Sequence, residues 1–275
     1  MFCFFIYYFL YKLIIMKKEL LLFICIMFFA FGKSQTNDPF QLVDLHVHLK
    51  GGFTVEDAIK KSKAEGIQYG IVVNCGVGFP LHNDSQIDSV LSDMKKYPQF
   101  YKGMQAEGRE WLTNFSKASI AKFDYVFTDA MTFTDAKGRR NRIWLKDETW
   151  IDNEDQFMEY LVNTLVKILN TEPINMYVNP TFLPAQMQDR YSFFWTPARM
   201  DRVINAAKKH GIAIEINNRY RIPSSEFITR AHKAGIKFTI GTNNMDSNFS
   251  RADYAIEMIN KCGLTEKDFY LPKKM

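Results

Sequence analysis

Seven short apolar segments alternate with seven amphipathic segments between residues 40 and 262, and this alternation restricts the fold more than any other feature. The apolar segments are hydrophobic on both faces, which is typical of strands in a parallel sheet covered by helices. The expected strands are 40–48, 68–74, 100–106, 124–130, 174–179, 212–216 and 237–242. The expected helices are 54–66, 84–97, 111–123, 157–169, 197–210, 223–234 and 248–262. Such units build either a closed barrel or an open doubly wound sheet.

A closed barrel is the better prediction of the two. The sequence has no Gly-x-Gly-x-x-Gly after an expected strand and no Walker motif, which argues against an open nucleotide-binding sheet. Its 275 residues, 47% of them hydrophobic, suit one barrel of about 250 residues. We therefore expect an α/β fold, a single distorted TIM-like (β/α)7 barrel. Its site should lie at the carboxyl ends of the strands, near the long connections 131–153 and 180–196.

Residues 1–34 have the features of a secretory signal peptide. A positive segment begins at Met16, the apolar stretch 20–31 follows it, and small residues then offer a cleavage site. This stretch is shorter than the roughly 20 residues of a transmembrane helix. We predict that Met16 is the true start and that residues 35–275 form the barrel domain. That domain should be periplasmic or secreted and should keep no stable membrane anchor.

The basic charge of the chain belongs largely to this leader. The formal net charge is +5, but residues 1–34 contain four lysines against one glutamate, which leaves +2 for the rest. A balance so near neutrality predicts no nucleic-acid partner.

The first expected strand ends in Asp44-Leu-His46-Val-His48. Residues two apart on a strand point to the same face, about 6.6 Å apart along the chain. His46 and His48 could therefore share one divalent cation at the barrel mouth. The alternative is a pair of histidines that simply pack or form hydrogen bonds at the strand end.

Several segments resemble the polymerase and histidinol phosphatase (PHP) family of metal-dependent hydrolases, a family that is similar to the amidohydrolases. The segment 44–48 matches the opening motif, and 54–66 with the following strand is similar to the first crossover. Gly103-Met-Gln-Ala-Glu107 resembles the strand that carries a metal-bridging glutamate, and the stretch 215–242 follows the order of the last units. The resemblance implies a (β/α)7 barrel and a metal-dependent hydrolase.

At least four of the metal ligands usual in that family are replaced. Asn74 follows the second strand, Asp129 the fourth and Asn179 the fifth, and Asn243 and Met245 stand in the closing motif. The remaining ligand-capable residues suffice for one or two ions rather than three. We expect four side chains to bind one divalent ion, Zn²⁺ or Mn²⁺, and Asp129 to act as a base or as a fifth ligand. The four expected ligands are His46, His48, Glu107 and Glu215.

Amide and basic side chains gather at the same strand ends and form the expected substrate-binding set. Amides suit sugar hydroxyls or a hard cation, and guanidinium groups suit phosphate and carboxylate. The expected substrate-binding residues are Lys50, Asn179, Asn217, Arg219, Asn243 and Asn244. Arg109, two residues past Glu107, is expected to act with Asp129 in catalysis by holding the anionic group. Several of the asparagines could equally be turn residues.

Three functions agree with these residues. The first is an exported metal-dependent hydrolase of a small anionic substrate, with a phosphoester favoured. The second keeps the metal but acts as a lyase or isomerase on a sugar acid. The third is a carbohydrate-binding protein without catalysis on a degenerate hydrolase scaffold.

We expect the exported protein to begin between Lys33 and Thr36, because the small residues favoured by signal peptidase end there. N-terminal sequencing of the secreted form checks this, and retention of Met1 or Met16 would contradict it.

Overall fold

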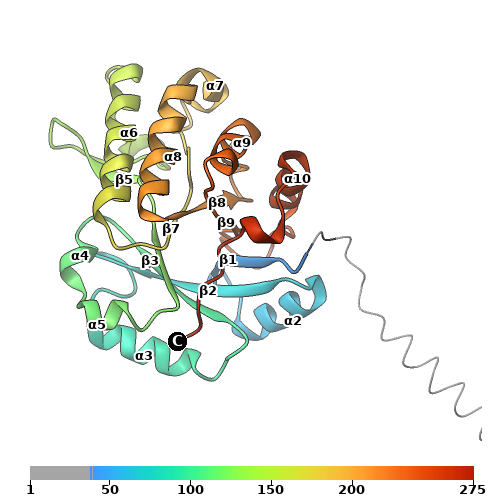
Figure 1. The fold of residues 1–275 in the computed structure, drawn as a ribbon. Helices are drawn as coiled ribbons and strands as arrows, with labels where there is room; N and C mark the ends of the chain where they lie inside the picture. Colours follow the sequence, from blue (N-terminus) through green and yellow to red (C-terminus); the bar gives the residue numbers. More distant parts are fainter. Residues whose placement is uncertain (1–37, 39) are drawn as a thin grey trace, which may run out of the picture. The chain divides into compact units, whose positions relative to one another are not determined.

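Seven parallel strands close into a barrel in the order β1-β2-β3-β4-β7-β8-β9 (Figure 1). The strands are β1 (Val43–His48), β2 (Gln68–Cys75), β3 (Tyr101–Ala106), β4 (Tyr125–Thr128), β7 (Met176–Tyr177), β8 (Ala213–Asn217) and β9 (Phe238–Gly241). The computed structural model describes residues 38 and 40–275, so the leader predicted at 1–34 lies outside the described residues. Every expected strand segment overlaps one barrel strand, although β2 and β8 each end one residue later than expected, and this confirms the predicted (β/α)7 fold.

The helices surround this barrel (Figure 1). They are α2 (Val55–Glu65), α3 (Asp84–Met94), α4 (Trp111–Asn114), α5 (Lys117–Ile120), α6 (Glu154–Thr171), α7 (Tyr191–Phe194), α8 (Pro197–His210), α9 (Ser225–Lys233) and α10 (Asp253–Cys262). Short 3-10 turns add η1 (Lys146–Glu148), η2 (Gln188–Arg190) and η3 (Glu266–Asp268). Within the described part of the chain, no helix has the length and apolar character needed to cross a membrane.

The third expected helix, 111–123, is in fact two short helices. Phe115 is extended between them, and the Ser116 side chain accepts a hydrogen bond from the Ser119 backbone N–H. This cap starts α5 afresh, because a serine side chain satisfies an amide that the helix start leaves unpaired.

The two long connections carry structure of their own. The segment 131–153 contains a small antiparallel sheet of β5 (Thr132–Thr134) and β6 (Arg140–Arg142), and 180–196 contains η2 and α7. Both follow a barrel strand, so both lie on the face where βα loops build barrel active sites.

The barrel interior is filled by a separate cluster of buried side chains from the strands. It consists of Leu45, Val72, Tyr125, Phe127, Met176, Val178 and Ala213. Gly70 and Gly103 make room for the Tyr125 side chain. A Cβ on Gly70 would lie 2.3 Å from its hydroxyl oxygen, and a Cβ on Gly103 would lie 2.4 Å from its ring atom Cζ. The Tyr125 hydroxyl donates to the Leu45 carbonyl at 2.8 Å. The filled interior leaves the carboxyl ends of the strands as the place for a site.

Phe127→Ala should destabilise the protein by about 3–5 kcal/mol, because it opens a cavity in this interior. Phe127 is fully buried, whereas Phe193 is 61% exposed and provides the matched control. Urea unfolding of the wild type, Phe127→Ala and Phe193→Ala measures the effect. Equal losses in both variants would show that the interior is not the stabilising core.

Candidate functional site

The two histidines of β1 lie side by side at the barrel mouth. Their ring centroids are 5.1 Å apart, and the His46 ring packs on Phe127 with a centroid distance of 4.6 Å. Both side chains are buried, and among the described residues neither Nε2 atom has a hydrogen-bond partner. Buried polar atoms are nearly always paired, so two unpaired imidazole nitrogens together need an explanation.

Glu215 of β8 fixes the orientation of the His46 ring. Its Oε1 lies 2.6 Å from His46 Nδ1, and its Oε2 accepts from the Asn179 backbone N–H at 2.8 Å and from Asn217 Nδ2 at 2.9 Å. A carboxylate that accepts these bonds leaves the proton on Nδ1, so Nε2 of the neutral ring carries a lone pair. The same carboxylate–histidine arrangement orients metal-binding histidines in many proteins.

Gly241 of β9 allows this close approach. A Cβ on Gly241 would lie 1.8 Å from Glu215 Oε1 and 2.9 Å from the His46 Cβ. Any other residue there would displace the buried pair. The expected closing motif begins at this glycine, but the sequence alone did not connect it with Glu215.

Asn179 is the centre of a network of amides behind the histidines. Its Oδ1 accepts from Asn217 Nδ2 and Asn243 Nδ2, each at 3.0 Å, and its own Nδ2 donates to Asp129 Oδ2 at 2.9 Å. Asn179 and Asn243 both have positive φ, at 48° and 47°, which an asparagine tolerates better than most residues. The network ties the ends of β4, β7, β8 and β9 together.

Two carboxyl groups share the mouth with these amides. Burial, together with the charge of Asp129, raises the pKa of Glu107 to about 8, although Asn74 Nδ2 donates to Glu107 Oε1 at 2.6 Å. Burial also raises the pKa of Asp129. Such perturbed pKa values are common among groups that bind cations or move protons.

Lys50 and Arg219 bring positive charge to the same place. Burial and the charge of Arg219 lower the pKa of Lys50, while Glu107 opposes the shift. Burial lowers the pKa of His48 well below its ordinary value, and the charges of His46, Lys50 and Arg219 add to the effect. Among the described residues, neither Lys50 nor Arg219 forms an ion pair, so both cations are available to an anion.

Arg109, in contrast, is engaged within the protein. Its Nη1 donates to Glu172 Oε1 at 2.7 Å, and its Nη2 donates to Thr128 Oγ1 at 2.7 Å and to the Asp129 carbonyl at 3.1 Å. Glu172 also accepts from the Trp111 indole at 2.9 Å. Arg109 therefore supports the backbone of Asp129. Glu172 could not be predicted as a site residue, because nothing in its local sequence connects it with a residue 63 positions earlier.

Asn244 and the backbone of Asn243 hold the end of β1. Asn244 Oδ1 accepts from the His48 N–H at 2.7 Å, and its Nδ2 donates to the His48 carbonyl at 2.9 Å. The Asn243 N–H donates to the His46 carbonyl at 2.8 Å. Both polar atoms of the Asn244 side chain are thus bonded to the backbone of His48, so Asn244 holds His48 in place and has no amide group free for a substrate.

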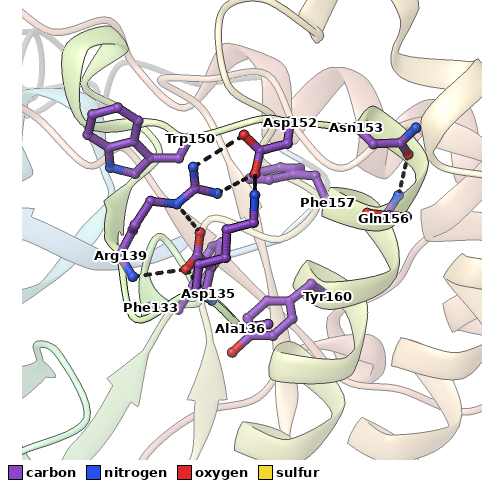
Figure 2. A pocket seen from close by; sticks show the side chains of 11 residues that line it. Phe133, Asp135, Ala136, Arg139, Trp150, Asp152, Asn153, Gln156, Phe157 and Tyr160 are labelled. Atoms are coloured by element: carbon purple, nitrogen blue, oxygen red, sulfur yellow. Dashed lines mark hydrogen bonds and ion pairs between the residues drawn. The ribbon is translucent and has the colours of Figure 1, made fainter.

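Lys137 and Arg139, in the connection after β4, line a separate small pocket of about 130 Å³. Figure 2 shows the Arg139 guanidinium between two carboxylates, with distances of 2.7 Å to Asp135 Oδ2 and 2.7 Å to Asp152 Oδ2. Lys137 Nζ donates to the same Asp152 at 2.8 Å. These cations neutralise acidic neighbours and stabilise the loop, so they offer no free charge to a substrate.

The structure brings most of the expected site residues together at one end of the barrel. Within residues 38 and 40–275, however, no three His, Cys, Asp or Glu side chains are grouped closely enough to hold a metal ion. His46 and His48 supply two lone pairs, while both oxygens of Glu215 are occupied by donors. A complete metal shell would need a carboxylate from the Glu107 and Asp129 side of the mouth.

Comparison with known proteins supports the fold. No family model and no curated protein matches the chain. The crystal structure of histidinol phosphate phosphatase from Lactococcus lactis subsp. lactis, complexed with zinc, L-histidinol and phosphate, matches with a TM-score of 0.53 and 14% identity over 84% of this chain and 95% of that one. An HpcH/HpaI aldolase from Desulfitobacterium hafniense matches with a TM-score of 0.38 and 10% identity over 82% and 91%. The first match supports a PHP-like fold.

Stability of the metal-free protein should fall between pH 5 and pH 8. Glu107 holds its proton up to about pH 8 in the folded protein, whereas the unfolded chain releases it near the ordinary pKa. Folding therefore takes up a proton in this pH range, and a rise in pH favours the unfolded state. The loss is on the order of 3 kcal/mol. Glu107→Gln cannot ionise and should therefore resemble the wild type near pH 5 and exceed its stability at pH 8.

Urea unfolding in chelator across this pH range checks the expectation, with the exposed Glu56→Gln as control. If the difference in free energy of unfolding between the wild type and Glu107→Gln did not change with pH, Glu107 would have its ordinary pKa and the expectation would be wrong.

Proposed function

We propose that this chain is an exported metal-dependent hydrolase of a small anionic substrate, a phosphoester above all. The observation that carries the proposal is the pair of buried, unpartnered Nε2 atoms of His46 and His48. They face a mouth that also contains two perturbed carboxyl groups and two cations without ion-pair partners among the described residues. Export rests on the leader features of residues 1–34.

The donor types at the mouth, two imidazoles and a carboxylate, are those that Zn²⁺ or Mn²⁺ prefers. His46 and His48 would hold it through Nε2, Glu215 would orient His46, and Glu107 would supply a carboxylate. When bound, such a cation polarises the ester and lowers the pKa of a water molecule toward neutrality.

The other residues of the mouth have separate tasks in this proposal. Asp129 would accept a proton from the attacking water, because its carboxylate belongs to the same network as Asn179 and burial raises its pKa. Lys50 and Arg219 bind the anionic group of the substrate. Arg109 positions Asp129 through the bond to its carbonyl rather than by touching the substrate.

One observation favours a second candidate, a carbohydrate-binding protein without catalysis. The described residues contain no complete group of three metal-binding side chains, and asparagine side chains gather at the mouth. Metal content separates the two candidates, because a binding protein of this kind needs no cation.

We expect purified wild-type protein to contain about one Zn²⁺ or Mn²⁺ per chain and His46→Ala/His48→Ala to contain none. Glu215→Gln should bind the metal about 10–100-fold more weakly, because it loses the group that orients His46. Elemental analysis of protein prepared without chelator measures the first effect, and metal titration measures the second. Phosphoester hydrolysis should follow the metal content.

The matched control is His82→Ala/His210→Ala, which removes two exposed histidines far from β1 in sequence. It should retain both metal and activity. Near-zero metal in the wild type, or unchanged metal in the β1 double variant, would refute the metal site and leave the carbohydrate-binding candidate.

A further inference from the structure

A cavity of about 460 Å³ lies beside the barrel mouth, and its lining includes neither the two histidines nor the carboxyl groups of the mouth. Its walls come from the connection after β7, the connection after β8, and α10. Its volume falls within the range of roughly 300–1,000 Å³ that is usual for small-molecule pockets.

Tyr220 joins this cavity to the mouth. Its backbone N–H donates to Asn217 Oδ1 at 2.9 Å, and Asn217 Nδ2 in turn donates to Glu215. Burial raises the pKa of Tyr220, and the charges of Asp129 and Glu215 contribute to the rise while Arg219 opposes it. Tyr220 lines the cavity, and the guanidinium carbon of Arg219 lies 5.0 Å from the centroid of its ring. A ligand in the cavity is therefore close to a cation of the mouth.

The backbone around the cavity is strained. Thr181 and Arg221 both line it and have φ values of 63° and 52°, a region that a β-branched residue such as threonine rarely adopts. The strained Thr181 lies at 2.7 Å from the Tyr191 hydroxyl, which donates to its Oγ1. Strain of this kind is concentrated at ligand sites.

The walls are aromatic, but they do not form a flat slot. Phe182 and Tyr220 meet edge to face, with centroids 4.8 Å apart and planes at 69°. The hydroxyls of Tyr191 and Tyr254 are bonded to Thr181 Oγ1 and to the Pro223 carbonyl, so these two residues present mainly their rings. A corner of this shape suits a thick, puckered ring better than a planar base, which prefers parallel faces.

The polar groups at the cavity edge are of mixed type. Arg221 and Glu257 form an ion pair at 2.6 Å that offers donors and an acceptor together. Gln188 and Lys261 also line the cavity, and the Gln188 amide donates to the Leu183 carbonyl at 2.9 Å, which leaves its oxygen to accept. Hydroxyl groups both donate and accept, so a polyhydroxylated ring matches this edge.

We propose that this cavity binds the sugar ring of the substrate, so that the substrate class is a sugar phosphoester. The sugar lies against Phe182 and Tyr220, and its phosphate reaches Lys50 and Arg219 at the mouth. The identity of the substrate as a phosphoester rests on the proposed function, whereas the sugar site itself does not.

The cavity alone is tested by measuring whether methyl glycosides bind to the metal-free protein in the absence of phosphate. Saturation-transfer NMR detects the binding. Ser225 lines the cavity in the first turn of α9, so Ser225→Trp fills the space. Phe182→Ala removes a wall instead, and remains informative if the filled variant fails to fold. Ser85→Trp makes the same change in the first turn of α3, outside the cavity, and is the matched control.

We expect a signal with at least one glycoside in the wild type and in Ser85→Trp. Ser225→Trp should abolish it, and Phe182→Ala should weaken binding about tenfold. No signal with any glycoside, or a signal that persists in Ser225→Trp and Phe182→Ala, overturns the sugar site. Glycoside binding together with failure to hydrolyse hexose phosphates or pentose phosphates would refute the proposed phosphoesterase and leave the sugar site standing.

Discussion

The buried pair of His46 and Glu215 is the interaction on which the barrel mouth depends. It joins β1 to β8 over the intervening strand β9, and Glu215 also accepts from the backbone N–H of Asn179 just past β7. Removing one partner would leave a buried hydrogen-bonding group unpaired, which costs about 1–3 kcal/mol. The absence of a side chain at Gly241 is part of the same arrangement, since a Cβ there would occupy the position of the carboxylate.

This pair also decides what the histidines can do. With Nδ1 committed to Glu215, only Nε2 of His46 can bind a ligand, and Asn244 fixes the backbone of His48 beside it. Two lone pairs thus point from a rigid strand end, which is the condition for a defined cation site. Lys50 and Arg219 balance the carboxyl groups nearby without being neutralised by ion pairs in the described part of the chain, so the mouth can still attract an anion.

The sequence was sufficient to predict the barrel, because hydrophobic alternation and helix signals such as Thr54 and Gly66 are local properties. It also indicated His46 and His48 as a pair, because strand geometry sets their common face. The partners of Arg109 and Glu215 could not be predicted. Arg109 pairs with Glu172 through a contact across 63 residues, which the closure of the barrel creates rather than any local pattern. The division of 111–123 into α4 and α5 was equally hidden, because it depends on the extended Phe115.

Two asparagines stabilise the carboxyl groups of the mouth. Asn74 donates to Glu107, and Asn179 donates to Asp129. A cation would stabilise those carboxylates by its charge, whereas the amides stabilise them only by hydrogen bonds. Part of the free energy that it costs to bury a negative charge therefore remains. The raised pKa values of both carboxyl groups are the expected consequence. The amides thus keep both carboxyl groups hydrogen-bonded, while the raised pKa of Asp129 leaves it able to take up a proton, which is the property that a general base needs.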